Sequence, residues 1–249
     1  MGKGILSFGG AFSNHLHALA YFCYIHNIPL IVLIRSYDPN PDTPTLKDIK
    51  NWGADIQILP PELYRRKEDA DMVRHWNRLF PDHLILPEGG SHRLALQGVH
   101  TMMNEIYYEI IDVDYYIVPV GTGATMAGMI QARKDSEMIV GISALKTSQL
   151  YHHLKYRWEL DKYTNWMTAE QWHWGGYGKT PDKLITFSNE FQSRHQIRLD
   201  PLYNGKAMYA LHQYFKYRLI PPGSKVIFIH TGGLQGWRGI RHMNQKTQK

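Results

Sequence analysis

The sequence is poor in cysteine and has no long hydrophobic run, and each absence excludes a class of protein. Cys23 is the single cysteine of the chain, so no disulfide can form within it. Its thiol lies in an apolar stretch and is expected to be buried, which suits a reducing compartment. No apolar run reaches the roughly eighteen residues that a membrane span needs, and residues 1–10 lack the pattern of a signal peptide. We therefore expect a cytoplasmic protein without a membrane partner.

The chain carries a net charge of +6, which raises the question of nucleic-acid binding. Its basic residues are scattered, and the one tight cluster, residues 238–249, is predicted to be a polar tail. No groove-reading motif accompanies the charge, so nucleic acid is not an expected partner. Hydrophobic residues make up 43% of the sequence, which is enough to build a core.

Short apolar runs alternate with helical patterns along most of the chain. The runs predict strands at 5–8, 30–34, 56–59, 84–86, 115–120, 138–142 and 225–229. The periodicity predicts helices at 13–26, 43–52, 62–79, 92–110 and 125–132. Continuous apolar strands separated by helices are typical of an α/β protein with parallel sheets flanked by helices. The Trp-rich stretch at 156–180 breaks this pattern and is interpreted either as a lid or subunit contact or as a locally packed excursion.

The strongest single motif is a glycine-rich turn between a predicted strand and a predicted helix. It consists of Gly121, Thr122, Gly123, Ala124 and Thr125. The glycines let backbone N–H groups approach an anion closely, and the start of the helix adds partial positive charge. The turn has neither a Walker ending nor a clean GxGxxG pattern. We predict that it binds a phosphate group.

Further glycine-marked turns lie at the ends of predicted strands or at the starts of helices. They occupy residues 7–15, 87–91, 200–206 and 229–233. Each is weak evidence alone because glycine turns after strands are common. Ser13 can be interpreted as a helix N-cap and nothing more. Alternatively, Ser13 and Asn14 face a ligand at the carboxyl edge of a parallel sheet.

Taken together and in this order, the five turns resemble those of the 1-aminocyclopropane-1-carboxylate deaminase/D-cysteine desulfhydrase family. That family of pyridoxal-phosphate (PLP) enzymes has an SNH helix start, an EGG turn, a GTG phosphate cup, a PxYxGK segment and an HTGG strand end. All five lie between Ser7 and Gly233. The resemblance implies a two-domain tryptophan-synthase-β-like fold, PLP as cofactor, a small amino acid as substrate and a homodimer. We expect a smaller α/β domain at 11–95 and a larger cofactor-binding domain formed by 1–10 plus 96–249.

The resemblance also implies roles for the residues that match these motifs. The turn at 121–125 would hold the PLP phosphate, and Asn14 would hydrogen-bond the ring hydroxyl. Ser13 would lie beside the substrate, and Tyr203 would be a substrate-side acid/base group. Thr231 would face the pyridine nitrogen. A neutral hydroxyl there does not force the ring to be protonated, which suits β-elimination.

Two positions favour a D-cysteine desulfhydrase-like lyase over a cyclopropane-opening deaminase. By resemblance, such deaminases carry Glu directly after the PxYxGK tyrosine and Leu at the position of the HTGG threonine. Here these positions are Asn204 and Thr231. Asn204 also differs from the small hydroxyl residue usual in desulfhydrases, which leaves the substrate open.

The Schiff-base lysine of that family lies upstream of the SNH turn and is absent from its expected place here. Lys3 is the only lysine ahead of Ser13 and precedes the first predicted strand, away from the ligand edge. Lys206 is interpreted as structural or phosphate-side. Three explanations stay open: a fragment or mis-started reading of a longer gene, which the intact motifs favour, a decayed paralogue, or a repurposed binding protein. The chain as given is expected to bind PLP weakly, with little or no turnover.

Other classes fit the sequence less well. A Rossmann-type oxidoreductase would need GxGxxG in the first turn, where residues 9–13 read GGAFS. His15 with His17, and His152 with His153, lack metal-ligand context, so no metal site is expected. A serine hydrolase would need GxSxG. The main rival is a non-catalytic protein that binds PLP or another phosphate ligand and uses its Trp-rich stretch as a partner surface.

Overall fold

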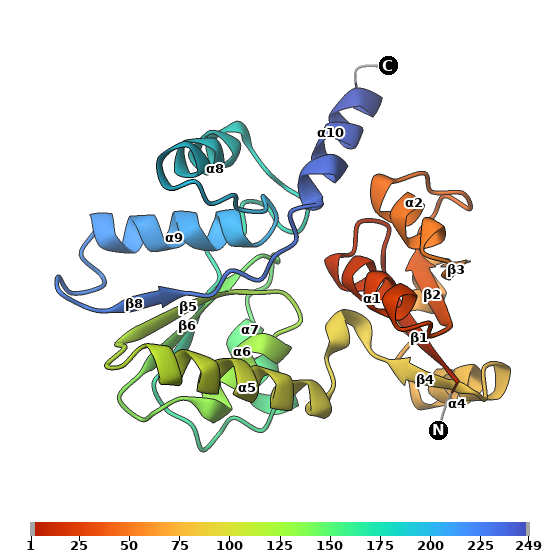
Figure 1. Cartoon of the computed structure of the whole chain (residues 1–249), viewed down its shortest axis with the longest axis horizontal. Helices are drawn as coiled ribbons and strands as arrows, with labels where there is room; N and C mark the ends of the chain where they lie inside the picture. The colour runs from red at the N-terminus through yellow and green to blue at the C-terminus, as the bar shows by residue number, and fades with distance from the viewer. Residues whose placement is uncertain (1–2, 248–249) are drawn as a thin grey trace. The chain divides into compact units, whose positions relative to one another are not determined.

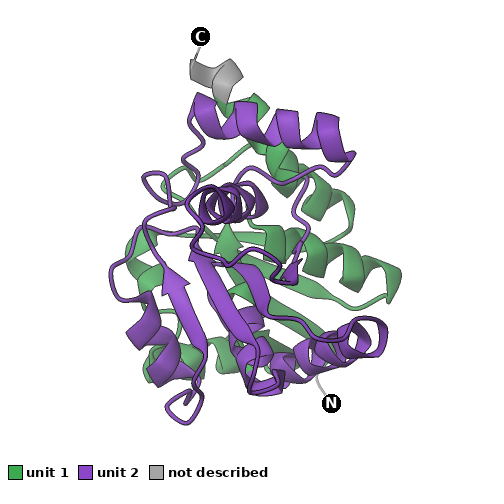
Figure 2. Cartoon of the chain, turned by 90° about the vertical axis from the view of Figure 1, so that its left-hand side faces the viewer, with its two compact units in different colours: residues 1–92, 235–249 green, residues 93–234 purple. Residues whose placement is uncertain are grey.

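The computed structural model describes residues 3–247, and the chain divides into two compact units (Figures 1 and 2). Unit 1 combines residues 1–92 with 235–249, and unit 2 comprises Arg93–Leu234. Each unit has its own four-stranded sheet, in which every strand pair is parallel. The predicted α/β class with parallel sheets is confirmed.

Unit 1 is built around a sheet of order β3-β2-β1-β4. Its strands are β1 (Gly4–Gly10), β2 (Leu30–Arg35), β3 (Asp55–Leu59) and β4 (His83–Leu86). Its helices are α1 (Asn14–Ile25), α2 (Pro44–Asn51), α3 (Pro61–Arg65), α4 (Ala70–Leu79), the short 3-10 helix η1 (Glu88–Gly90) and α10 (Gly236–Thr247). One sheet face packs on α1 and α2 through Leu16, Cys23 and Ile49, and the other packs on α3 and α4 through Tyr64 and Trp76. Burial of both faces explains why these strands are apolar throughout.

Unit 2 is built around a sheet of order β7-β6-β5-β8. Its strands are β5 (Tyr115–Val120), β6 (Met138–Ser143), β7 (Trp166–Ala169) and β8 (Val226–Phe228). Its helices are α5 (Arg93–Glu109), α6 (Ala124–Ala132), α7 (Leu150–Arg157), α8 (Asp182–His195) and α9 (Asn204–Lys216). Helices α5 and α6 cover one face of the sheet and α9 covers the other (Figure 1). Because β5 and β8 are neighbouring parallel strands, the turns that follow them lie at the same sheet edge.

The two units divide the chain differently from the expected domains. Residues 1–10 were expected in the larger domain, but Gly4–Gly10 form β1, whose backbone pairs with β2 and β4 in unit 1. Residues 235–249 were also expected in the larger domain but belong to unit 1. There Gly239 approaches the ring of Phe12 and Arg238 pairs with Asp48. The alternation of strands and helices does not indicate which sheet a segment packs with. For this reason both chain ends were assigned to the other unit.

Two predicted segments need correction. The single helix expected at 62–79 is two helices, α3 and α4, because the chain turns at residues 66–69. Arg66 Nε donates to Asp69 Oδ2 at 3.0 Å across this turn. The polar tail predicted at 238–249 is a helix as far as Thr247, and the side chain of Ile240 is buried; residues 248 and 249 lie outside the described part. The many polar residues of α10 hid its amphipathic pattern in the sequence.

The Trp-rich stretch is packed into unit 2. Trp158 and Trp166 are buried in the core on the α6 side of the sheet, and Trp172 packs against the α9 side. Residues 166–169 add an edge strand to the sheet. Of the two interpretations, the structure therefore supports the packed excursion.

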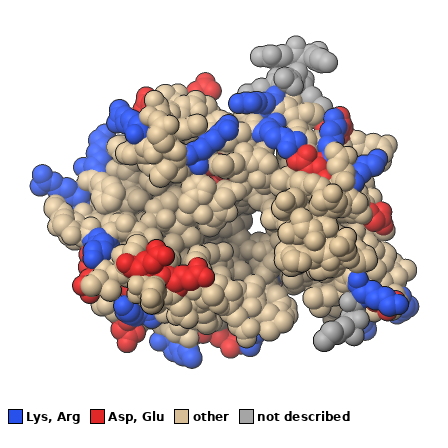
Figure 3. Space-filling view, viewed as in Figure 1, with Lys and Arg blue, Asp and Glu red and all other residues tan. Residues whose placement is uncertain are grey.

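Lys and Arg side chains are dispersed over the face shown in Figure 3, with uncharged side chains between them. Among residues 3–247, no helix is both long and apolar enough to cross a bilayer.

Candidate functional site

The glycine-rich turn of unit 2 has the geometry of an anion site. Gly123 is the N-cap of α6, with φ +91°, and no side chain caps the first turn of this helix. A Cβ at residue 123 would also overlap Leu154 Cδ2, so both the backbone angle and the packing require glycine. The N–H groups at the start of α6 are therefore left to a ligand or solvent, which is the arrangement that holds phosphate groups.

Tyr203 lies against this turn, although it comes from a distant part of the chain. A Cβ at Gly121 would lie 3.1 Å from Tyr203 Cε1 and 3.5 Å from its hydroxyl oxygen. Tyr203 is half-buried and is the N-cap of α9. Its ring centroid also lies 5.9 Å from that of Tyr177. The structure thus brings the predicted phosphate turn and the predicted acid/base residue together.

Thr231 is held near the same place through Asn204. The backbone N–H of Thr231 donates to Asn204 Oδ1 at 3.0 Å, and Asn204 Nδ2 donates to the carbonyl oxygen of Gly232 at 2.9 Å. Asn204 directly follows Tyr203, and its side chain is fully buried. Because Thr231 follows β8 and Gly121 follows β5, all three predicted segments of unit 2 meet at one edge of its sheet.

Lys206 is structural. Its side chain is fully buried, and Nζ donates to the carbonyl oxygens of Ala144, His173 and Gly176 at 3.3, 3.0 and 2.8 Å. Burial lowers the pKa of Lys206 to about 8, against a smaller opposing effect of the Asp200 carboxylate. Three carbonyl acceptors use all three N–H donors of the ammonium group, so Lys206 holds the Trp-rich loop and has no donor left for a phosphate.

In unit 1, Ser13 and Asn14 lie at the start of α1, after the carboxyl end of β1. Ser13 caps the helix, because its Oγ accepts the N–H of Leu16 at 3.2 Å. Asn14 Oδ1 accepts from Gln235 Nε2 at 2.6 Å. Ser13 and Asn14 belong to unit 1, whereas the phosphate turn, Tyr203 and Thr231 belong to unit 2. Their roles toward substrate and cofactor stay predictions.

The SNH and EGG turns meet within unit 1 around His15. His15 Nε2 lies 2.8 Å from Ser7 Oγ, and Ser7 donates its own proton to the carbonyl oxygen of Leu86 at 2.9 Å. His15 must therefore donate from Nε2, which sets its tautomer. Burial lowers the pKa of His15 to about 4, so the ring is neutral at physiological pH. A Cβ at Gly90 of the EGG turn would lie 3.7 Å from the same ring.

Four residues of these networks were not among the predicted site residues. Ser7 and His15 lie within the turn at 7–15. Ser7 could have been found as a polar residue in a predicted buried strand. Asp200 opens the PxYxGK segment and could have been found from its position before a helix. Gln235 had no sequence signal, since its contact with Asn14 joins the two ends of the chain.

The paired histidines lie in ordinary surroundings. His17 pairs with Asp48 at 2.8 Å, and His152 and His153 are exposed on α7. Among residues 3–247, the structure places no three His, Cys, Asp or Glu side chains where they could share a metal ion.

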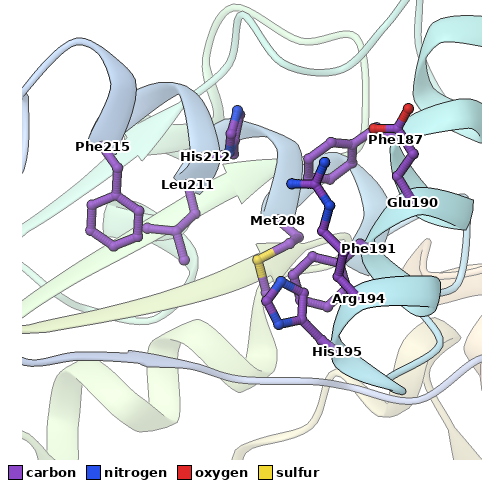
Figure 4. Close-up of a pocket in the computed structure, with 9 residues that line it drawn as sticks. All are labelled: Phe187, Glu190, Phe191, Arg194, His195, Met208, Leu211, His212 and Phe215. Carbon is purple, nitrogen blue, oxygen red and sulfur yellow. The ribbon is translucent and has the colours of Figure 1, made fainter.

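A separate groove of about 530 Å³ lies between α8 and α9 (Figure 4). It is lined by Phe187, Glu190, Phe191, Arg194, His195, Met208, Leu211, His212 and Phe215. None of the predicted site residues lines it, so its size does not make it the candidate site.

Comparison with known proteins gives the family. A model of the pyridoxal-phosphate dependent enzymes matches residues 2–232. A 1-aminocyclopropane-1-carboxylate deaminase of a Bradyrhizobium species is 25% identical over 265 residues, covering 96% of this chain and 78% of the relative. A Thermotoga maritima protein provisionally given the same name is also 25% identical, over 248 residues, covering 93% of this chain and 78% of its own length. A solved structure described as an ACC deaminase homologue matches with a TM-score of 0.79 at 23% identity, covering 98% of this chain and 78% of that one.

These matches confirm the resemblance inferred from the five turns, including the fold and the cofactor of the family. The glycine cradle at Gly123 and the uncapped start of α6 fit the phosphate of that cofactor. The chain belongs to the pyridoxal-phosphate dependent enzyme family and is similar to its 1-aminocyclopropane-1-carboxylate deaminases.

Proposed function

We propose that this protein is a PLP-dependent lyase or deaminase acting on a small amino acid, and that β-elimination of the D-cysteine desulfhydrase kind is favoured over cyclopropane ring opening. The observation that carries the proposal is the meeting of three segments in unit 2: the turn at 121–125, Tyr203 and Thr231. They supply an anion site, a phenol and a hydroxyl at one sheet edge. Such a combination suits a phosphorylated aromatic cofactor.

The residues of unit 2 fit the parts of PLP in turn. Gly121, Thr122, Gly123, Ala124 and Thr125 would hold the phosphate through backbone N–H groups and hydroxyls. When bound, PLP supplies the electron sink that makes loss of the Cα proton of an amino acid feasible. Tyr203, whose ring packs on the phosphate turn, would exchange a proton with the substrate. Thr231 would meet the ring nitrogen with a neutral hydroxyl.

From unit 1, Asn14 would hydrogen-bond the ring hydroxyl and Ser13 would help to move protons beside the substrate. The contacts of both residues support this proposal in part. Asn14 Oδ1 already accepts from Gln235, so its Nδ2 is the atom that would donate to a ring oxygen. Ser13 accepts the Leu16 N–H, which leaves its own proton to donate.

The preference for β-elimination comes from Asn204 and Thr231. Neither matches the Glu and Leu that the resemblance associates with ring opening. The buried side-chain amide of Asn204 makes its hydrogen bonds to the Thr231–Gly232 turn and to Asp200. Because residue 204 is an amide, it has no carboxylate to offer to a ring nitrogen. A neutral partner such as the Thr231 hydroxyl suits a substrate whose carbanion quickly expels a β-substituent.

The alternative is a non-catalytic protein that binds PLP or another phosphate ligand. One observation favours it: Lys206, in the PxYxGK segment, spends its donors on three backbone carbonyls and is not available as a Schiff-base lysine. Lys3 is exposed and precedes β1, at the amino end of the strand. We propose that neither lysine substitutes for the Schiff-base lysine of the family, so that PLP binding by this chain is weak and turnover small.

We also propose a cytoplasmic location and a homodimer. Cys23 is buried and unpaired, as suits a reducing compartment.

An absorbance titration with PLP, followed by borohydride reduction and peptide mass mapping, tests the proposal. We expect saturable but weak binding, and no reduced adduct on Lys3 or Lys206. Pyruvate formation from D-cysteine and 2-oxobutyrate formation from 1-aminocyclopropane-1-carboxylate are measured in parallel. A robust desulfhydrase rate would overturn the weak-turnover expectation, and a stoichiometric adduct would name the working lysine. Failure to bind PLP at all would reject the proposed function.

A further inference from the structure

A buried carboxylate stands behind the Tyr203 and Thr231 segments. Asp200 is fully buried, and its Oδ1 accepts the backbone N–H groups of Leu202 and Tyr203, each at 2.9 Å. Its Oδ2 accepts the backbone N–H of Asn204 at 2.7 Å and also the Nδ2 of the same residue. Asp200 thus replaces an ordinary N-cap and ties together the start of α9.

The orientation of the Asn204 amide follows from its neighbours. On the Nδ2 side lie two groups that can only accept, the Asp200 carboxylate and the carbonyl of Gly232. On the Oδ1 side lies the Thr231 N–H, which can only donate. A flipped amide would lose all of these bonds, so the position of the oxygen is fixed without reference to hydrogen positions.

This network binds the Thr231–Gly232 turn through its backbone. Thr231 N donates to Asn204 Oδ1 at 3.0 Å, a normal length, whereas the hydroxyl of Thr231 lies 3.4 Å from the same oxygen. That second contact is longer than a good hydroxyl hydrogen bond. Thr231 is exposed. Its hydroxyl is therefore held only loosely by the protein and can donate to a ligand, while its backbone is firmly placed.

We propose that Asp200 and Asn204 are positioning residues: Asp200 orients the Asn204 amide, and Asn204 fixes the Thr231–Gly232 turn so that the Thr231 hydroxyl meets the ring of the cofactor. The proposal rests on the proposed function, because it takes that ring to be the ligand of Thr231. It also explains why a polar residue is buried at position 204. Its amide serves the turn rather than contacting the ligand.

The test uses two ligands that share one part of the site. Inorganic phosphate needs only the turn at 121–125, whereas PLP needs that turn and Thr231. Asn204→Asp keeps the acceptor for Thr231 N–H but puts a second carboxylate against Asp200. The variant also loses the Nδ2 donor to Gly232, so its acceptor oxygen is no longer oriented toward the turn, and we expect amide hydrogen exchange at Thr231 to become about tenfold faster or more. The affinity for PLP should fall about threefold to tenfold, while the affinity for phosphate stays at the wild-type value.

The double variant Asp200→Asn/Asn204→Asp provides a rescue. It removes one of the two carboxylates, so exchange at Thr231 should return part of the way toward wild type although Asp200 is lost. Glu137→Gln is the matched control, because Glu137 is another buried carboxylate of unit 2 that accepts a backbone N–H, from Lys134 at 2.8 Å. It should change neither the exchange at Thr231 nor the ratio of the two affinities.

Each outcome decides one part. Unchanged exchange at Thr231 in Asn204→Asp would overturn the role of Asn204 in holding the turn. Faster exchange with equal losses of PLP and phosphate affinity would overturn the role toward the ring, because a purely structural defect acts on both ligands. If wild-type chain binds neither ligand, the proposed function fails and with it the ring contact, while the exchange measurement still decides the hydrogen-bond network.

Discussion

In each unit a helix follows an inner strand of the parallel sheet, and the two helices begin in opposite ways. In unit 1, α1 follows β1 and is capped by the side chain of Ser13. In unit 2, α6 follows β5 and begins at Gly123, with no side-chain cap. The first turn offers side chains to its surroundings, and the second offers bare backbone N–H groups. The same strand–turn–helix motif therefore provides polar side chains in unit 1 and an anion site in unit 2. The difference follows from the N-cap residue, which is Ser13 in one and Gly123 in the other.

The two largest effects are expected from Gly123→Ala and Lys206→Met. Gly123→Ala distorts the bare helix start. The new methyl group would overlap Leu154 at a positive φ, so the free energy of unfolding should fall by about 3 kcal/mol. Gly223→Ala is the matched control, because Gly223 has φ +87° and no atom within 4 Å of a new Cβ. It should cost only about 1 kcal/mol for the backbone conformation. Urea denaturation measures both values. An equal loss of unfolding free energy in the two variants would show that Leu154 does not confine the turn.

Lys206→Met tests the anchor of the Trp-rich loop. Three carbonyl groups would lose their donor, and we expect the free energy of unfolding to fall by about 3 kcal/mol. Lys216→Met, on the exposed side of the same helix, is the control and should change it by less than about 0.5 kcal/mol. A small effect of Lys206→Met would mean that the loop is held by its tryptophans alone.

The same lysine predicts a pH dependence. Burial lowers the pKa of Lys206 to about 8, so the folded chain releases this proton at a lower pH than the unfolded chain. Its contribution to stability therefore rises with pH, by about 1.5 kcal/mol between about pH 8 and 9.5. The rise should be missing from Lys206→Met. A parallel pH curve in both proteins would contradict the assignment.

A smaller effect is expected in unit 1 from Asp48→Asn, which breaks the tie between α2 and α10. Asp48 accepts from Arg238 at 2.5 Å and from His17, and the Arg238 guanidinium above all lowers the pKa of its carboxyl. We expect a loss of about 1 kcal/mol at pH 7 and faster exchange in α10. The difference should disappear as the pH falls through the lowered pKa, where Asp48 protonates in both states. Asp82→Asn, at an exposed carboxylate of unit 1, should have no such effect.

The smallest expected effect is that of Ser13→Ala, which removes the side-chain cap of α1. Loss of the cap should cost about 1 kcal/mol, and Ser13→Gly should cost only a few tenths. The exchange rates of unit 2 amides should not change. If Ser13→Ala left α1 equally protected, the contrast between the two helix starts would lose its basis.

Much of the fold could be predicted from the sequence because burial on both faces makes parallel strands apolar. The runs at 115–120 and 30–34 gave strands almost to the residue. The edge strand at 166–169 escaped, because it is short and partly exposed and tryptophans dominate its surroundings. Helices α8 and α9 also escaped, since their apolar residues are mixed with polar ones, and Lys206 and Gln213 of α9 are themselves buried.

The candidate site was predictable where glycine is required and less so where partners come from afar. Gly123 is demanded by its positive φ and by Leu154, and a glycine turn after a strand is visible in any sequence. The burial of Lys206 against three carbonyls could not be read from a PxYxGK motif. The Gln235 contact with Asn14 depends on where the end of the chain packs, which local patterns do not encode.

The most direct test of the account compares PLP with pyridoxal, which lacks the phosphate, as ligands of the wild-type chain and of Gly123→Ala. We expect PLP to bind the wild type about tenfold to a hundredfold more tightly than pyridoxal, and we expect Gly123→Ala to remove this difference. Equal affinities of the wild type for the two ligands would contradict the claim that the bare start of α6 is the phosphate site.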